Sequence, residues 1–146
     1  MALRLVLDTN VVLDIFHWHN TGATPILNAA RAGRVSLVIN TRCLAELRLV
    51  LHRPQFGLTE ATAEEIVGRY AALATQNHGT AAPQPHVALP RCRDEDDQKF
   101  LELARDAGAD LLVTRDKALL SLARRKFALN GFRIVRPEQA AAILDG

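Results

Sequence analysis

Two aspartates stand directly beyond apolar runs that predict buried strands. Asp8 follows the run 3–7, and Asp116 lies two residues beyond Thr114, where a second run ends. Because ligands of open parallel sheets bind just outside the carboxyl ends of the strands, both carboxylates fall where a site would lie. An aspartate in front of a helix is also an ordinary N-cap, and for either residue taken alone capping is the better supported interpretation.

A third acidic residue, Glu46, lies in a stretch that is apolar nearly all round. The stretch 43–51 predicts a largely buried helix, and glutamate is almost never fully buried without a partner. Glu46 therefore needs a cation, a buried arginine or a cleft. A salt bridge to Arg42 or Arg48 and a role as a metal ligand explain it equally well, and both alternatives stay open.

A fourth acidic position is Asp97, near the start of another predicted helix. Asp97 is in register with Leu101 and Ala104, which form the inward stripe of that helix. A carboxylate that continues an apolar stripe is expected to face a pocket rather than solvent. Asp94 is three residues earlier and shares this face, but its role is ambiguous. The two acids between them fall on other faces, as at a solvated helix start that the macrodipole favours.

Four converging carboxylates would have a definite chemistry. They repel one another, so the cluster must hold protons or bind cations. Ligands that are all oxygen suit Mg²⁺ or Mn²⁺ rather than zinc. Two such ions, about 3.5–4 Å apart, can activate a water and stabilise the leaving oxygen in phosphodiester cleavage.

Other kinds of site find no support. Cys43 and Cys92 are far apart and form no CxxC pair, so they predict free thiols rather than zinc ligands. The five histidines are scattered, no glycine-rich nucleotide-binding motif is present, and no serine or cysteine nucleophile has a visible partner.

The elements that would position the acids alternate along the chain. Buried strands are predicted at 3–7, 35–39, 110–114 and 131–135, with a weak one at 87–89. Helices are predicted at 10–17, 25–32, 41–51, 59–76, 94–107 and 117–127, and from Pro137 onward. The alternation predicts an α/β fold with a mostly parallel sheet and helices on both faces. The Gly/Pro/Ala-rich stretch 77–90 is interpreted as an internal loop, so residues 1–146 are expected to form a single domain.

Composition narrows the class of protein further. The 146 residues are 49% hydrophobic and 23% charged, as in ordinary globular proteins. No apolar run approaches the ~20 residues that span a bilayer, and the N-terminus lacks the pattern of a signal peptide. We therefore expect a cytoplasmic protein with no membrane partner. A net charge of +2 permits nucleic-acid binding without arguing for it.

Four segments together resemble the PIN-domain family. They are Leu7-Asp8-Thr9-Asn10, the stretch 44–47, the acidic run with its helix at 94–104, and Leu112-Val113-Thr114-Arg115-Asp116. The segments stand in the family's order at its approximate spacing and cover essentially the whole chain. The likeness is closest to prokaryotic toxin components of toxin–antitoxin pairs, the VapC-like ribonucleases.

The resemblance implies a fold, an activity and a set of residues. The fold would be a three-layer α/β/α sandwich, and the activity Mg²⁺- or Mn²⁺-dependent endonucleolytic cleavage of RNA. The positions matching the family's acidic quartet of catalytic and metal-binding residues are Asp8, Glu46, Asp97 and Asp116. Those matching an extra acid and the supporting hydrogen-bonding positions are Asp94, Thr9, Asn10 and Thr114. The resemblance also implies a homodimer and a small cognate antitoxin protein that blocks the site.

One position departs from the pattern, and other functions remain to be weighed. Arg115 stands where this branch often has glycine, and it would either contact a phosphate or lie outward. A PIN-like module that binds RNA or protein with little catalysis is the main alternative. A receiver-like domain is disfavoured because Val135 is followed by Arg136 rather than lysine, and a DxD phosphatase because Asn10 stands two residues beyond Asp8.

Two further features have competing explanations. Trp18 could stack on a base, but burial at an interface or simple packing is favoured. The run Arg124-Arg125-Lys126 could contact phosphates, although a solvated helix end that complements the dipole is slightly favoured.

Overall fold

The computed structural model describes residues 2–76, 97–123 and 132–145. Several expectations lie outside these ranges: the loop at 77–90 with its weak strand, Cys92, Asp94 and the basic run 124–126.

In the described ranges, five parallel strands form one sheet. Their bounds are β1 Leu3–Leu7, β2 Val35–Ile39, β3 Thr75–Gln76, β4 Leu111–Val113 and β5 Arg133–Val135. The order across the sheet is β3-β2-β1-β4-β5, and every neighbouring pair is parallel. The predicted parallel sheet is confirmed, and β1 is its central strand, with β2 on one side and β4 on the other.

Seven α-helices and one short 3₁₀ helix connect the strands in the described ranges. They are α1 Thr9–Phe16, α2 Thr24–Arg31, α3 Thr41–Leu51, η1 Pro54–Phe56, α4 Glu60–Leu73, α5 Gln98–Asp106, α6 Lys117–Leu122 and α7 Pro137–Asp145. Each predicted helix is present. The prediction was wrong at the end of α4, where Thr75 and Gln76 pair as a strand with Val38 and Ile39. The open edge of β2 recruits them once the helix ends at Leu73.

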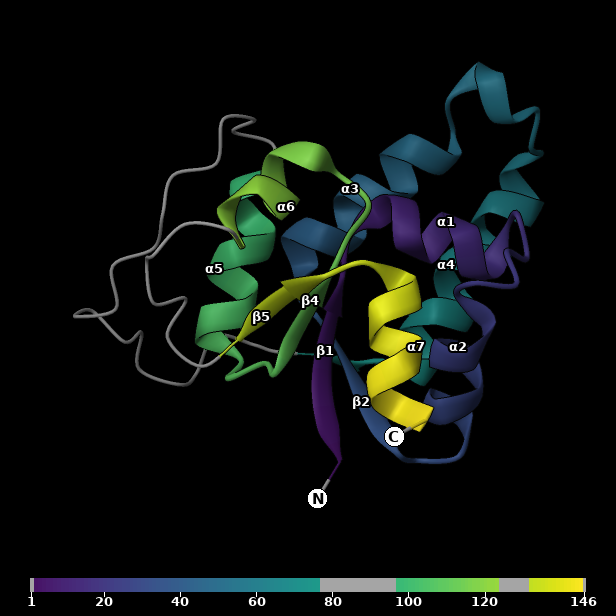
Figure 1. Ribbon diagram of the computed structural model, residues 1–146. Helices are drawn as coiled ribbons and strands as arrows, with labels where there is room; N and C mark the ends of the chain where they lie inside the picture. The colour runs from purple at the N-terminus through teal and green to yellow at the C-terminus, as the bar shows by residue number, and fades with distance from the viewer. Residues whose placement is uncertain (1, 77–96, 124–131, 146) are drawn as a thin grey trace.

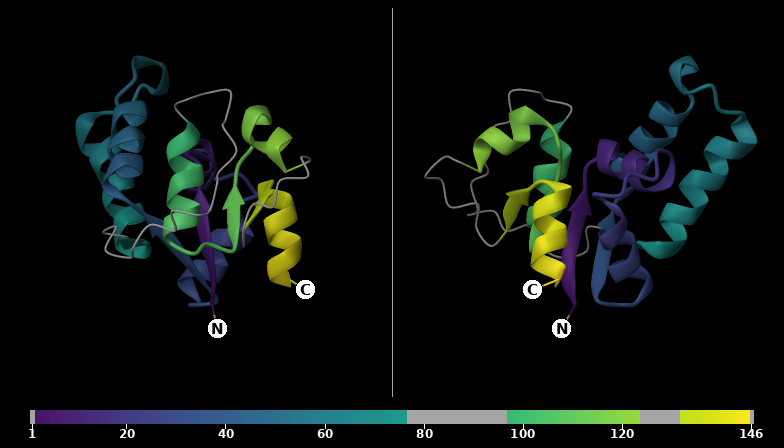
Figure 2. Two further views of the ribbon diagram at one scale, coloured as in Figure 1. Left: turned by 90° about the vertical axis from the view of Figure 1, so that its left-hand side faces the viewer. Right: turned by 45° about the vertical axis from the view of Figure 1, so that its right-hand side comes forward.

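The helices cover both faces of the sheet, which confirms the three-layer arrangement. Side chains alternate along β1, so Leu5 and Leu7 join one core and Val6 joins the other. The first core is closed by α1, α2, α4 and α7, and the second by α5 and α6. Figure 1 shows α5 and α6 at the left of the sheet and α2, α4 and α7 at its right; Figure 2 turns these two sides toward the viewer.

Helix α3 differs from its prediction. The helix is not buried all round, because Leu49 is 71% exposed and Ala45 is also exposed. Its buried side chains divide between the two cores: Leu47 and Leu51 pack in the first and Cys43 in the second. The helix therefore lies across the end of the sheet, where one side must face solvent.

Within the described ranges, no helix combines the length and the apolar character that crossing a bilayer requires.

Candidate active site

Asp8 lies at the centre of the candidate site because β1 is the central strand. Strand register places Leu7 opposite Val113 on β4, and the Asp8 N–H donates to the Val113 carbonyl (3.0 Å). The carboxylate is only 3% exposed. One oxygen accepts the Asn10 N–H at 3.4 Å, and the other accepts the Thr114 hydroxyl at 2.6 Å. Asp8 thus caps α1 and is a buried acid at the same time, so the two interpretations of this residue are compatible.

The electrostatics of Asp8 identify its acidic neighbours. Burial is the main cause of a raised pKa at Asp8, because it removes the charged form from water. The hydrogen bonds from Thr114 and Asn10 oppose the shift. The charges of Asp116 and Glu46 raise the pKa of Asp8 further, so these three carboxylates are close enough to interact.

Asp116 reaches the same region from β4. Its carboxylate caps α6 by accepting the backbone N–H groups of Ala118 (2.7 Å) and Leu119 (3.3 Å). Its own N–H donates to the Thr114 hydroxyl at 2.9 Å, and that hydroxyl donates to Asp8. Thr114 is fully buried. A single threonine therefore links the two aspartates at the ends of neighbouring strands.

Glu46 reaches the site from α3 and is held by two donors of the chain. Asn40 at the end of β2 caps this helix, accepting the Cys43 N–H at 2.9 Å. One Glu46 oxygen accepts the Thr9 hydroxyl, and the other lies 2.6 Å from the Lys99 ammonium. The arginines considered as partners are engaged elsewhere, Arg42 with Glu102 and Arg48 with Glu64.

The remaining predicted residues take different positions. Asp97 is buried at the N-terminal end of α5, and Leu101 and Ala104 continue its inward stripe as expected. Asn10 is exposed, and its contact with the site is the backbone N–H that Asp8 accepts. Asp94 lies outside the described residues.

The donor set fits a hard divalent cation. It consists of carboxylate oxygens, which are the ligands that Mg²⁺ and Mn²⁺ prefer, around a buried acid whose charged form lacks solvation. In the part of the chain that the structure describes, no group of three acid, histidine or cysteine side chains forms a ready-made metal cluster. Two of these carboxylates already have partners within the protein. Asp116 accepts the N–H groups at the start of α6, and Glu46 contacts Thr9 and Lys99.

Among the described residues, the basic side chain in contact with a candidate ligand is Lys99, which the sequence interpretation missed. Arg115 lies outward, bound to Asp14 at 2.6 Å and to Glu138 at 2.7 Å. Lys99 stands two residues after Asp97, a spacing that does not by itself place both side chains on one helix face. The available signal was the position of a lysine two residues beyond the acidic run.

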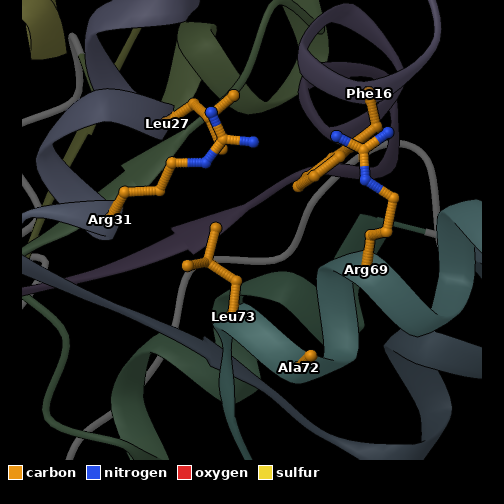
Figure 3. A pocket seen from close by; sticks show the side chains of 6 residues that line it. All are labelled: Phe16, Leu27, Arg31, Arg69, Ala72 and Leu73. Carbon is orange, nitrogen blue, oxygen red and sulfur yellow. The ribbon is translucent and has the colours of Figure 1, made fainter.

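A separate cavity of about 290 Å³ lies between α1, α2 and α4 (Figure 3). It is lined by Phe16, Leu27, Arg31, Arg69, Ala72 and Leu73. The Arg69 guanidinium stands over the Phe16 ring, 5.5 Å from its centre. None of the described residues that line this cavity is acidic, so it is distinct from the acidic site.

Two smaller observations bear on residues raised by the sequence. Trp18 is 61% exposed, which contradicts simple packing; its ring contacts His17 and Phe56 at the surface. Cys43 is a free, buried thiol, and burial raises its pKa to about 12. A thiol with so high a pKa is not a reactive nucleophile at neutral pH.

Comparisons with a family model and with a solved structure agree with the observed fold. Residues 4–118 match the family model described as PIN domain. A similar solved structure is the crystal structure of VapBC2 from Rickettsia felis bound to a DNA fragment from their promoter. The match has 13% identity and a TM-score of 0.60, and covers 92% of this chain and 98% of the other. No curated protein matches the sequence.

Proposed function

The chain belongs to the PIN domain family, and from that premise we propose that it is a metal-dependent endoribonuclease that hydrolyses phosphodiester bonds of RNA. PIN domains are generally nucleases that use divalent metal ions. We assign the reaction to one PIN-like domain formed by residues 1–146. The observation that supports the proposal most strongly is the buried Asp8 carboxylate, with two further acids close enough to raise its pKa.

The proposed mechanism gives each residue a definite task. Asp8, Glu46, Asp97 and Asp116 would hold one or two Mg²⁺ or Mn²⁺ ions, with Asp94 as a further ligand. The bound cation would supply Lewis acidity for attack of water on the phosphodiester. Two threonines orient the ligands through contacts already present: Thr114 donates to Asp8, and Thr9 donates to Glu46. Because water would be the attacking group, the mechanism requires no nucleophilic side chain.

The proposal extends to partners. The similar structure from Rickettsia felis is of VapBC2 with promoter DNA, and on that likeness we assign this chain the role of the toxin in a toxin–antitoxin pair. It would act in the cytoplasm as a homodimer, and its cognate antitoxin would block the acidic site.

The decisive experiment measures cleavage of a mixed-sequence fluorescent RNA by purified protein in Mn²⁺, Mg²⁺ or EDTA. We expect metal-dependent cleavage that Asp8→Asn and Asp116→Asn reduce at least ~100-fold, since each removes a charged ligand. The control is Asp106→Asn, whose acid pairs with Arg105 on α5 and should leave cleavage unchanged. Cleavage that survives EDTA and both site variants would refute the assignment.

A catalytically weak module that binds RNA or protein is the second candidate. The absence of a ready-made metal cluster in the described ranges and the pairing of Glu46 with Lys99 favour it. Its signature in the same experiment would be RNA retained on the wild-type protein without cleavage in any metal.

A further inference from the structure

The contact between Lys99 and Glu46 joins two helices at the acidic site. The ammonium on α5 lies 2.6 Å from one carboxylate oxygen of Glu46 on α3, and the other oxygen accepts the Thr9 hydroxyl. The side chains of Lys99 and Glu46 are 12% and 26% exposed, so the pair is shielded from water far more than the surface pairs of α3. Shielding of this kind makes the attraction persistent, because salt screens it less.

The contact of Lys99 with the candidate ligands is its ion pair with Glu46. Lys99, Glu46 and Asp8 all lie near Cys43 on the inner side of α3, because the charge of each shifts the pKa of that thiol. The other basic side chains considered for the site, Arg42 and Arg115, are bound to acids elsewhere. Lys99 is thus the basic side chain that the described contacts place against a candidate ligand.

We propose that Lys99 is a positioning residue that holds Glu46 in the metal-free protein and competes with the divalent cation for that carboxylate. The proposal rests on the assignment of Glu46 as a metal ligand in the proposed function. A lysine suits this task because its ammonium is a compact point charge on a flexible stem, and so it can move away. The charge of the site is then balanced before metal arrives, at the expense of metal affinity.

If Lys99 competes with the metal ion, its loss should change metal affinity in the direction opposite to that expected for a merely structural lysine. Loss of a structural residue would weaken metal binding by loosening the site. Loss of a competing cation strengthens metal binding, because the Glu46 oxygen that Lys99 contacts is released and one nearby positive charge disappears.

Calorimetric titration of the metal-free protein with Mn²⁺ at constant pH and ionic strength tests the sign. We expect Lys99→Met to bind Mn²⁺ at least about tenfold more tightly than wild type. Lys99→Arg keeps the charge and should bind Mn²⁺ no more tightly than wild type does. Arg42→Met removes one positive charge from α3 at an exposed pair with Glu102, and its affinity should also remain that of wild type.

Wild-type protein offers a second measurement, which remains valid if Lys99→Met fails to fold. The chain has three lysines, Lys99, Lys117 and Lys126, so its side-chain ammonium signals are simple to assign by NMR. On titration with Mg²⁺, the Lys99 signal should move in proportion to saturation.

The outcomes separate this proposal from the proposed function. Unchanged or weaker Mn²⁺ binding in Lys99→Met, an equal gain in Arg42→Met, or no binding to either wild type or Lys99→Met overturns the role of Lys99. A Lys99 signal unmoved at Mg²⁺ saturation overturns it as well. If Lys99→Met binds Mn²⁺ more tightly but no variant cleaves RNA, the role of Lys99 as competing cation is supported. Only the proposed nuclease activity is then refuted.

Discussion

At the scale of single residues, Asp8 imposes an energetic cost on the folded protein. Its carboxylate is buried, and burial raises its pKa from the ordinary 3.8 more than the hydrogen bonds from Thr114 and Asn10 lower it. The folded protein therefore binds the Asp8 proton more tightly than the unfolded chain does. By linkage, Asp8 removes stability as pH rises from about 3.8 through its raised folded pKa.

This cost predicts a stabilised variant. In EDTA at pH 7, Asp8→Asn should raise the Tm by a few degrees, given that ~1 kcal/mol shifts the Tm of such a chain by ~2–4 °C. The gain should shrink as pH falls and vanish below about 3.8, where Asp8 is protonated in both states. Thermal unfolding across this pH range measures the difference. A lower Tm for Asp8→Asn at pH 7 would contradict the account.

Some residues of the candidate site could be predicted from the sequence, and others could not. Asp8 and Asp116 could be predicted because each follows an apolar run directly, and the end of a strand fixes where the next side chain stands. Glu46 could be predicted to need a partner, but the partner itself could not. Lys99 belongs to another helix, and contacts between helices depend on packing angles that sequence spacing does not encode.

At the scale of elements, three helices begin at the carboxyl ends of the three central strands. Each is capped by a polar side chain that accepts backbone N–H groups: Asp8 for α1, Asn40 for α3 and Asp116 for α6. Helix N-termini carry partial positive charge, which offsets part of the repulsion among the acids gathered there. The helix starts thus support the site electrostatically as well as sterically.

The cap of α3 can be tested separately from the acids, because Asn40 is not itself a proposed metal ligand. Asn40→Ala removes the acceptor of the Cys43 N–H and should destabilise the protein by about 1 kcal/mol. Urea unfolding measures the loss. The matched control is Asn28→Ala at an exposed position inside α2, where alanine is the better helix former and stability should not fall. Equal losses in both variants would refute a specific capping role.

Element boundaries were predictable where a cap or a glycine marks them. Asn40 and Thr59 cap α3 and α4, whose first residues, Thr41 and Glu60, lie at or next to the predicted starts at 41 and 59. Gly33 follows α2 with a φ of +75°. The strand β3 could not be predicted, because two residues carry no periodicity. It forms only since β2 presents an unpaired edge, which is a property of the assembled sheet.

At the scale of the whole molecule, the last helix completes a core that begins at the first strand. The family match ends at residue 118, yet β5 and α7 lie beyond it and pack on the same sheet. Ala140 on α7 is fully buried in the core shared by β1 and α2. The folded state therefore depends on contacts across almost the full length of the described chain.

A charge placed in this interface should be severely destabilising. Ala140→Asp buries an unpaired carboxylate and should cost at least about 3 kcal/mol, equivalent to a drop in Tm of roughly 10 °C. Ala142→Asp places the same residue at an exposed position of the same helix and should change the Tm little. Thermal unfolding of the two variants provides the comparison, and equal Tm values would show that α7 is not part of the cooperative core.

The fold class could be predicted from the sequence, but the order of the strands in the sheet could not. Alternating strands and helices, with continuous apolar runs such as 3–7, indicate a covered parallel sheet. The strand order β3-β2-β1-β4-β5 depends on which strands pair with one another. Because the apolar runs are similar in sequence, they do not indicate which of them are neighbours.

Both ends of the described chain lie at the same end of the sheet, because β1 starts there and α7 finishes there (Figure 1). The carboxylates stand at the opposite end, where β1 and β4 finish. An affinity tag or a fluorescent reporter attached to either end would therefore extend away from the acids. Protein immobilised through such a tag would present the acidic face to an RNA flowing past it, so surface-based binding measurements can be made without shielding the site.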